Sequence, residues 1–393
     1  RRAGSPSTPS GLIRRACRGQ AVLRLMDPVR SLRFVGVGLI LVVMAGLAAE
    51  SAAVPRVPAP VGSDRFIAKR AYAGDFPDPS VLRVGKKWYA YSTTVASLNL
   101  PAITSKDLSR WKVIAKRRGT HDAFPTPGKW VQSRRVGRRW FANTWAPSVA
   151  RIGKRFVLAY SAPVAGQAMG PDLIKKYCVS VAVARRPAGP FRDRSASPLI
   201  CPPNTGVIDP AIFIDPAGTP WLYWKTEQAP RQRLPAQIYG QQLNAAGTGF
   251  AQGSAPVQLL QTEQPWEGIL IENPSMVAFA NRFYLFYSGG SYAKPSYATG
   301  YAICESQLGP CVRAANSPVL TSGAGVDGPG GASAFLDRAG RLRLAYAAWR
   351  QGNFGYPNNK GCLRTPEGCA QRHLHVATLT AAPDGSLLVV NRG

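Results

Sequence analysis

Asp78-Pro-Ser-Val-Leu-Arg-Val-Gly-Lys-Lys-Trp-Tyr-Ala-Tyr-Ser92 is the stretch that decides the fold of this 393-residue chain. It joins an Asp-Pro-Ser-Val element to an aromatic strand through a turn at Gly85. Two apolar runs on either side of a glycine turn are typical of a β-hairpin. The stretch therefore predicts two antiparallel strands.

The same two-part pattern occurs five times along the chain. The aromatic strands end at Tyr91, Tyr160, Trp224, Tyr287 and Tyr346, which are 69, 64, 63 and 59 positions apart. The elements that precede them begin at Asp78, Ala146, Asp209, Asn273 and Gly331, and the last of these is degenerate. A β unit of roughly 60 residues repeated five times predicts an all-β fold, a five-bladed β-propeller around a channel.

The N-terminal part has the features of an export signal. Arg30 and Arg33 precede an uncharged apolar run from Phe34 to Ala49, and the small residues Ser51-Ala-Ala53 follow. This pattern predicts an N-terminal extension and signal peptide over 1–53, a mature start near 54, a linker over 54–71 and the catalytic propeller over 72–393. We expect a secreted, extracellular protein; a single membrane anchor is the alternative.

Cysteine usage agrees with export. Outside the predicted extension, six cysteines form three local couples, and none of them is a C-x-x-C motif. Disulfides are therefore favoured over zinc. Among fifteen possible connectivities we predict that neighbours pair: Cys178 with Cys201, Cys304 with Cys311, and Cys362 with Cys369.

The net charge is strongly positive, +29. No nucleic-acid-binding motif accompanies it, so we expect no nucleic-acid partner. The densest basic run extends from Lys116 to Arg139. It fits a solvated loop, or a surface that attracts an acidic cell-wall polymer.

Three carboxylates stand at corresponding places in the repeat. Asp78 and Asp209 immediately precede the Pro of their units, and Glu272 lies one place before Asn273 of the fourth unit. Because the first strand of a propeller blade lines the channel, these carboxylates are predicted to meet at one mouth. Hydrolysis of a glycosidic bond needs an acid and a carboxylate on opposite sides, and a third carboxylate can keep the acid protonated. Asp-Pro also caps ordinary turns, and Asp75 is a rival to Asp78.

These motifs together resemble glycoside hydrolase family 43, the arabinanase, arabinofuranosidase and β-xylosidase family. The resemblance implies an inverting hydrolase with Asp78 as general base, Glu272 as general acid, and Asp209 as the residue that modulates the pKa of the acid and orients it. The motifs that carry it are Phe76-Pro-Asp-Pro-Ser80, Ser105-Lys-Asp-Leu-Ser-Arg-Trp111, Thr144-Trp-Ala-Pro147, Ala188-Gly-Pro-Phe191, Ile208-Asp-Pro210, Ile271-Glu-Asn-Pro-Ser275 and Gly328-Pro-Gly330.

The sequence also departs from the family pattern. Members often carry a His that ligates a channel ion, where Gly331 stands here, and a second His where Ala347 stands. We therefore predict no metal and no cofactor, and channel calcium is disfavoured. Glu267 is close enough to Glu272 to be an alternative acid.

Three further residues are candidates for substrate binding. Trp145 could stack on a sugar, Phe76 could wall the same pocket, and Arg350 could donate to sugar hydroxyls. Ordinary blade packing would explain the two aromatic residues equally. We expect the partner to be a polysaccharide or oligosaccharide, and the protein to be a monomer.

The function favoured by these features is hydrolysis, with inversion, of pentose-containing plant polysaccharides by an α-L-arabinofuranosidase or arabinanase. A β-xylosidase of the same family and a non-catalytic carbohydrate-binding propeller are the alternatives. A retaining fructan hydrolase would show Asn-Asp-Pro-Asn-Gly, Arg-Asp-Pro and Glu-Cys motifs, which are absent from the sequence.

Overall fold

The computed structural model describes residues 68–115, 121–137, 139–169, 174–227, 235–356 and 369–393. All of them belong to the compact unit Ala59–Gly393. The predicted extension and signal peptide, 1–53, lie outside the described residues. Within the described part, no helix is long and apolar enough to cross a membrane.

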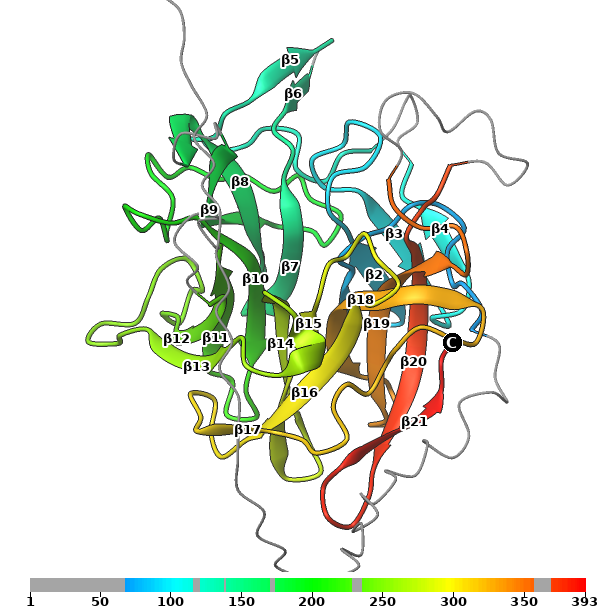
Figure 1. Cartoon of the computed structure of the whole chain (residues 1–393). Coiled ribbons are helices and arrows are strands. Elements are labelled where there is room, and N and C mark those ends of the chain that lie inside the picture. The colour runs from blue at the N-terminus through cyan, green and yellow to red at the C-terminus, as the bar shows by residue number, and fades with distance from the viewer. Residues whose placement is uncertain (1–67, 116–120, 138, 170–173, 228–234, 357–368) are drawn as a thin grey trace, which may run out of the picture. The chain divides into compact units, whose positions relative to one another are not determined.

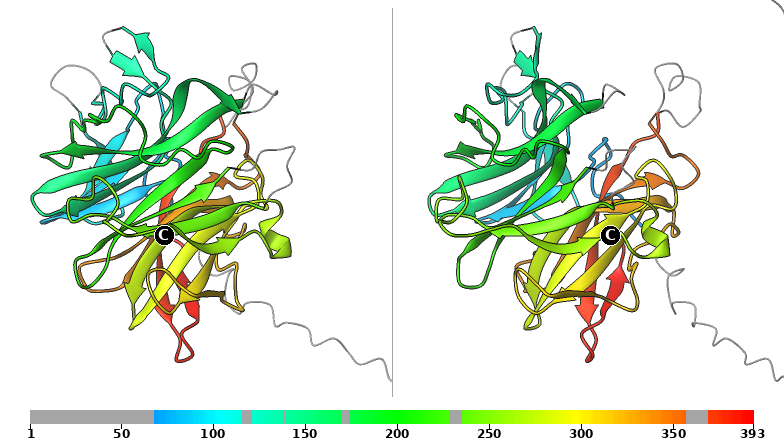
Figure 2. Two further views of the ribbon diagram at one scale, coloured as in Figure 1. Left: turned by 90° about the vertical axis from the view of Figure 1, so that its left-hand side faces the viewer. Right: turned by 60° about the vertical axis from the view of Figure 1, so that its left-hand side comes forward.

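Five antiparallel sheets confirm the predicted five-bladed β-propeller (Figures 1 and 2). Each predicted hairpin forms the first two strands of one blade. The blades are β1 (Ser80–Val84), β2 (Lys87–Tyr91), β3 (Ala102–Ser105) and β4 (Trp111–Val113); β7 (Trp145–Ile152), β8 (Arg155–Met169) and β9 (Ile174–Ala184); β10 (Val207–Ile214), β11 (Pro220–Thr226), β12 (Gln237–Gln242) and β13 (Val257–Gln261); β14 (Ile271–Phe279), β15 (Arg282–Gly289), β16 (Ala298–Cys304) and β17 (Cys311–Arg313); β18 (Val326–Leu336), β19 (Leu342–Arg350), β20 (His373–Ala381) and β21 (Leu387–Asn391).

The first and last blades are neighbours, which closes the ring. The inner strands contact one another in the order β1, β7, β10, β14, β18, and β18 returns to β1. The segment before β1 also pairs with the last blade: the N–H groups of Ala71 and Phe76 donate to the carbonyls of Leu374 and Arg372 at 2.7 and 2.8 Å. The end of the predicted linker is thus bound to blade 5.

All five blades turn sharply at the same place in the inner strand. The turning residues have positive φ, in the left-handed region that side chains other than glycine rarely adopt. Their φ angles are 51° at Asp78, 39° at Ala146, 57° at Asp209, 52° at Asn273 and 62° at Gly331. In blades 2 to 5 the strand register shifts at these residues. In these four blades the turn is therefore a bulge, a feature that redirects a side chain out of the sheet.

Side chains from the preceding blade bind the N–H groups at four of these turns. Thr93 Oγ1 accepts from Ala146 N–H, Ser161 Oγ from Asp209 N–H, Asp209 Oδ2 from Asn273 N–H, and Ser288 Oγ from Gly331 N–H, at 2.8 to 3.1 Å. Bonding the N–H groups offsets the cost of leaving the strand ladder. The geometry of each turn thus depends on its neighbouring blade.

The repeated aromatic strands hold adjacent blades together. In blades 1, 3 and 4 a buried tyrosine of this strand donates its hydroxyl to a backbone carbonyl of the next blade. These bonds run from Tyr91 to Pro187 at 2.6 Å, from Tyr223 to Gln307 at 2.9 Å and from Tyr284 to Gly385 at 2.9 Å. A buried ring contributes apolar area to the core, and the hydrogen bond of its hydroxyl fixes the orientation of the side chain. This explains why the aromatic pattern recurs in the sequence.

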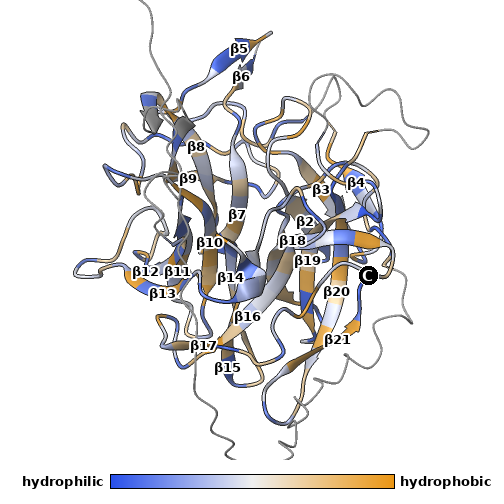
Figure 3. Ribbon diagram, viewed as in Figure 1, coloured by the Kyte–Doolittle hydropathy of each residue, from blue (hydrophilic) through white to orange (hydrophobic). Residues whose placement is uncertain are grey.

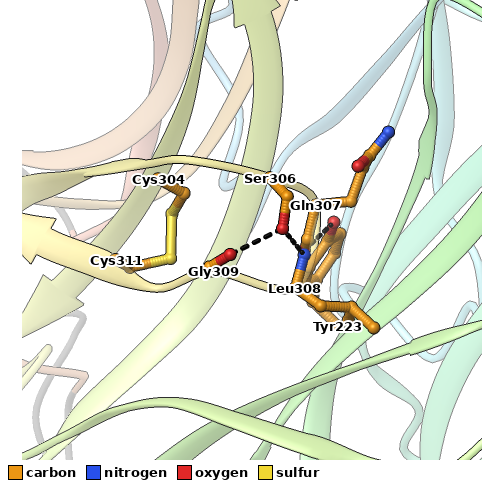
Figure 4. The surroundings of a disulfide bond; sticks show 7 residues. All are labelled: Tyr223, Cys304, Ser306, Gln307, Leu308, Gly309 and Cys311. Atoms are coloured by element: carbon orange, nitrogen blue, oxygen red, sulfur yellow. Dashed lines mark hydrogen bonds between the residues drawn. A yellow bond between two sulfur atoms is a disulfide. The ribbon is translucent and has the colours of Figure 1, made fainter.

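Two of the predicted disulfides are confirmed, Cys178–Cys201 and Cys304–Cys311. The second joins β16 to β17, and Ser306 Oγ donates to the carbonyl of Gly309 within the same turn (Figure 4). Cys362 of the third predicted pair lies outside the described residues.

A small hairpin, β5 (Arg134–Val136) and β6 (Arg139–Phe141), projects away from the blades. Its β5 strand is among the most hydrophilic segments of the domain (Figure 3). It contains the described end of the basic run that begins at Lys116, whereas residues 116–120 and 138 lie outside the described part. The described end of the basic run is therefore part of a hairpin that projects from the blades.

Candidate active site

The inner strands surround a narrow channel that opens into a wider cavity. The channel measures about 100 Å³ and is lined by four residues from each blade, beginning at the five turning residues. The cavity measures about 460 Å³, within the size range of small-ligand sites. Its lining residues are Asp75, Pro77, Asp78, Thr93, Thr94, Val95, Ala96, Asn143, Trp145, Ile208, Asp209, Glu272, Asn273, Tyr292, Tyr356 and Arg372. The structure thus brings the three predicted carboxylates to one cavity.

Asp78 is held through both carboxylate oxygens. Thr93 Oγ1 donates to Oδ2 at 2.6 Å, and Nη1 of Arg372 donates to Oδ1 at 3.1 Å. Arg372 is almost completely buried and also donates to the carbonyl of Gly330. Charge-assisted hydrogen bonds from fixed partners orient a carboxylate well. Asp78 therefore presents a positioned carboxylate to the cavity.

Asp209 is more deeply buried than the other two. Its Oδ2 accepts the N–H of Asn273 at 3.0 Å. Burial raises the pKa of Asp209 well above its usual value, the charge of Glu272 raises it further, and the Lys225 ammonium opposes both. The ionised form of Asp209 is thus less favoured than that of an ordinary aspartate.

Glu272 lies between a phenol and an ammonium. Tyr297 donates its hydroxyl to Oε1 at 2.7 Å, and Lys225 Nζ is 3.5 Å from Oε2. Burial alone would lower the pKa of Lys225, but Glu272 and Asp209 outweigh it and raise that pKa. Lys225 is therefore a buried cation, placed to stabilise negative charge on Glu272.

Lys225 and Arg372 were missed by sequence reasoning. A signal for Lys225 existed: in the strand register it occupies the place of Ser161, Ser288 and Ala347 in blades 2, 4 and 5. A lysine at a channel position otherwise held by small residues indicates a charged partner. Arg372 lies just before β20, outside any repeat, so no pattern predicts it.

The residues around Gly331 do not fit a channel cation. Gly331 offers no ligand, and a Cβ built on it would lie 2.5 Å from Asp78 Oδ1 and 3.2 Å from Nη2 of Arg372. The guanidinium would repel a metal ion at this place. Among the described residues, no three His, Cys, Asp or Glu side chains are grouped to hold a metal.

The three predicted substrate-binding residues have different surroundings. Trp145 lines the cavity, and one face of its indole stacks on Tyr177 at 3.8 Å between ring centroids. Phe76 is 1% exposed and belongs to the core beside Tyr72, not to the cavity lining. Arg350 is exposed at the end of β19 and does not line the cavity either. Only Trp145 of the three is thus available to a sugar in the cavity.

The two rival carboxylates also differ. Asp75 lines the cavity, and its Oδ1 accepts Arg372 N–H at 2.8 Å and the Tyr356 hydroxyl at 3.1 Å. Glu267 is fully buried and is bound by Arg313 Nε at 2.7 Å. Although burial opposes it, the hydrogen bond from Arg313 holds the pKa of Glu267 below its usual value. Glu267 therefore belongs to a separate structural network.

Carboxylates facing one another around a cavity are the groups with which glycoside hydrolases work. This fold and this set of side chains define that class of protein. The family model for glycosyl hydrolases family 43 matches residues 71–378. The chain belongs to this family.

Relatives with curated functions match over short stretches. An arabinoxylan arabinofuranohydrolase of Bacillus subtilis is 31% identical over 133 residues, which are 31% of this chain and 22% of that protein. Xylosidase/arabinosidase 43B of Humicola insolens is 28% identical over 162 residues, 39% of this chain and 26% of that protein. The matched stretches span only 22% and 26% of the length of these two curated relatives.

Solved structures match over most of the domain. The crystal structure of a thermostable family-43 glycoside hydrolase has a TM-score of 0.64 and 26% identity, covering 81% of this chain and 94% of that one. An exo-1,5-α-L-arabinanase from a bovine ruminal metagenomic library has a TM-score of 0.57 and 18% identity, covering 80% and 96%. The second likeness supports the fold alone.

Proposed function

We propose that this protein is an inverting glycoside hydrolase that releases pentose from plant polysaccharides, with an α-L-arabinofuranoside as substrate. The observation that carries the proposal is the convergence of Asp78, Asp209 and Glu272 on one cavity, each in a different environment. Different environments allow chemically identical groups to take different roles.

The surroundings support a distinct role for each carboxylate. Asp78, fixed by Thr93 and Arg372, is the base that takes a proton from the attacking water. Glu272 is the acid that protonates the leaving oxygen, and the carboxylate formed there is stabilised by Lys225 and Tyr297. Water attacks on the face of the sugar opposite the departing oxygen, so the anomeric configuration inverts.

Asp209 acts through its neighbours. Its side chain holds the N–H of Asn273, the residue that follows Glu272, and thereby fixes the direction in which Glu272 points. The charge of Glu272 raises the pKa of Asp209, so the two carboxyl groups are electrostatically coupled. Asp209 is therefore a positioning residue and a modulator of Glu272.

The choice of substrate rests on the relatives. One is an arabinoxylan arabinofuranohydrolase and another a xylosidase/arabinosidase, so arabinose is preferred and a β-D-xyloside is the second candidate. The indole of Trp145, which lines the cavity, is where the sugar ring would stack. We also propose secretion, in agreement with the two disulfides.

One assay tests both the substrate and the mechanism. The protein is incubated with 4-nitrophenyl α-L-arabinofuranoside, 4-nitrophenyl β-D-xyloside and debranched arabinan, and the first-formed anomer is followed by proton NMR. We expect turnover of the arabinofuranoside with inversion. Retention would contradict the mechanism, and no turnover of any pentoside would favour a carbohydrate-binding propeller.

Matched variants test the assignments. Asp78→Asn and Glu272→Gln should each lower kcat by about 10²- to 10⁴-fold, the usual contribution of a general acid or base. Asp75→Asn, at the rival carboxylate in the same cavity, should lower kcat much less. If Asp75→Asn abolishes turnover and Asp78→Asn does not, the role of base belongs to Asp75.

A further inference from the structure

Five arginine side chains line a groove on blade 2 that the proposed catalytic site does not use. The groove measures about 810 Å³. All five side chains are exposed: Arg155 at the start of β8, Arg185 and Arg186 after β9, and Arg192 and Arg194 on the segment that follows.

The groove lies at the opposite end of blade 2 from the cavity. Trp145 begins the eight-residue strand β7 at the cavity, and the strand ends at Ile152, which pairs with Arg155. Phe156 then pairs with Ala184, just before Arg185. At about 3.3 Å per residue, β7 separates the two sites by roughly 20 Å. A ligand in the groove is therefore distinct from a sugar in the cavity.

The arginines are not neutralised by the protein. Among the described residues, none of the five guanidinium groups forms a hydrogen bond or ion pair. Asp193 is the acidic residue in the lining, but both of its carboxylate oxygens accept hydrogen bonds from the protein; Oδ1 accepts from the N–H and the hydroxyl of Ser195. Its Oδ2 accepts from Tyr160, Ser180 and Trp130 at 2.6, 2.9 and 3.1 Å. The groove thus concentrates positive charge with its counter-charge committed elsewhere.

The chemistry of the lining indicates the class of ligand. Guanidinium groups bind carboxylates and phosphates through paired hydrogen bonds, and several in one groove favour a ligand with repeated negative charges. The remaining lining residues are small or aliphatic: Val181, Val183, Ala184, Gly189, Pro190, Ser195 and Thr248. None of the residues described in this lining offers a ring on which a nucleic-acid base could stack.

We propose that this groove binds an acidic polysaccharide, a polymer with repeated uronic-acid carboxylates. The choice of a polysaccharide rests on the proposed function, because pentose side chains and uronic acids would then occur in the same matrix. The groove holds the protein to the acidic polymer through blade 2, while the cavity at the other end of the blade remains open to substrate.

Binding is tested with de-esterified polygalacturonate at about 0.15 M NaCl, where weak surface attraction is screened. Arg185→Gln/Arg186→Gln should weaken binding about ten-fold, because two charge-assisted contacts are lost. The matched control is Lys86→Gln/Lys87→Gln, which removes the same charge from exposed positions in the β1–β2 turn of blade 1. It should change the affinity less than two-fold.

Three results would overturn the proposal. They are no binding of polygalacturonate by the wild-type protein, equal weakening in both double variants, and tighter binding of duplex DNA than of polygalacturonate. Hydrolysis of 4-nitrophenyl α-L-arabinofuranoside should be the same in the wild type and Arg185→Gln/Arg186→Gln. Because binding and hydrolysis are measured separately, failure of the groove proposal is distinguishable from failure of the proposed function.

Discussion

Replacing Gly331 by Ala should damage catalysis far more than stability. The new Cβ would lie 2.5 Å from Asp78 Oδ1, whereas ordinary contacts of this kind begin near 3.4 Å. The carboxylate must therefore move by about 1 Å, and a misplacement of about 1 Å can cost about 10²-fold in rate. We expect kcat to fall 10- to 100-fold, which at the upper end corresponds to about 2.7 kcal/mol of lost transition-state stabilisation.

Gly340→Ala is the matched control. Gly340 also has positive φ, +72° against +62° at Gly331, but its Cβ would meet no atom within 4 Å. Both variants carry a similar backbone strain of about 1 kcal/mol, so both should melt a few degrees lower. The assay compares kcat, KM and the melting temperature of the two variants on the best pentoside. If kcat of Gly331→Ala stays within two-fold of Gly340→Ala, the close packing of Gly331 on Asp78 has no catalytic role.

Three more changes test the charged groups of the cavity. Lys225→Met should lower kcat more for oligosaccharides than for aryl glycosides, because the good leaving groups of aryl glycosides need less protonation. Lys225→Arg should recover part of the loss. Equal losses on both substrates would contradict the role given to Lys225. Arg372→Lys should lower kcat on every substrate, because an ammonium cannot reproduce the guanidinium contacts to Asp78 and Gly330; unchanged kinetics would contradict it. Burial raises the pKa of Asp209, so the native state holds a proton on this side chain at a pH where the unfolded chain has released it. Binding this proton stabilises the native state, and the stabilisation is lost as pH rises through the raised pKa. Asn cannot lose a proton in this pH range, so Asp209→Asn escapes the loss of stability that the wild type undergoes. The unfolding free energy of Asp209→Asn minus that of the wild type should therefore increase between about pH 4 and pH 7 in denaturant titrations. A decrease of this difference would contradict the raised pKa.

The repeat made the fold predictable from the sequence. Five hairpins with turning residues in register identify the blades, and the same register brings Asp78, Asp209 and Glu272 to the channel. Two disulfides followed from cysteine spacing alone. These features are local, or are copied from one unit to the next, so a pattern in the chain reveals them.

The partners of the carboxylates were not predictable in this way. Arg372 reaches Asp78 across 294 positions, and no periodicity connects the two residues. Phe76 stands two residues before Asp78, and Arg350 follows Trp349 in the fifth blade, but neither side chain lines the cavity. Phe76 packs in the core, although Asp78, two residues further along the chain, faces the cavity. The positive-φ turn at Asp78 redirects the chain, so the alternation of a regular strand does not describe these two side chains.

The bond between Arg372 and Asp78 also orders the assembly of the protein. Asp78 lies at the start of blade 1, whereas Arg372 belongs to blade 5. The segment that carries Asp78 also pairs with blade 5. During synthesis Asp78 is made long before Arg372, so this hydrogen bond forms only after the last blade has been made. Contacts between such distant parts of a chain form slowly, because a long loop has to close. We expect catalytic activity to appear late in folding, in a single step, when the first and last blades pair and close the ring.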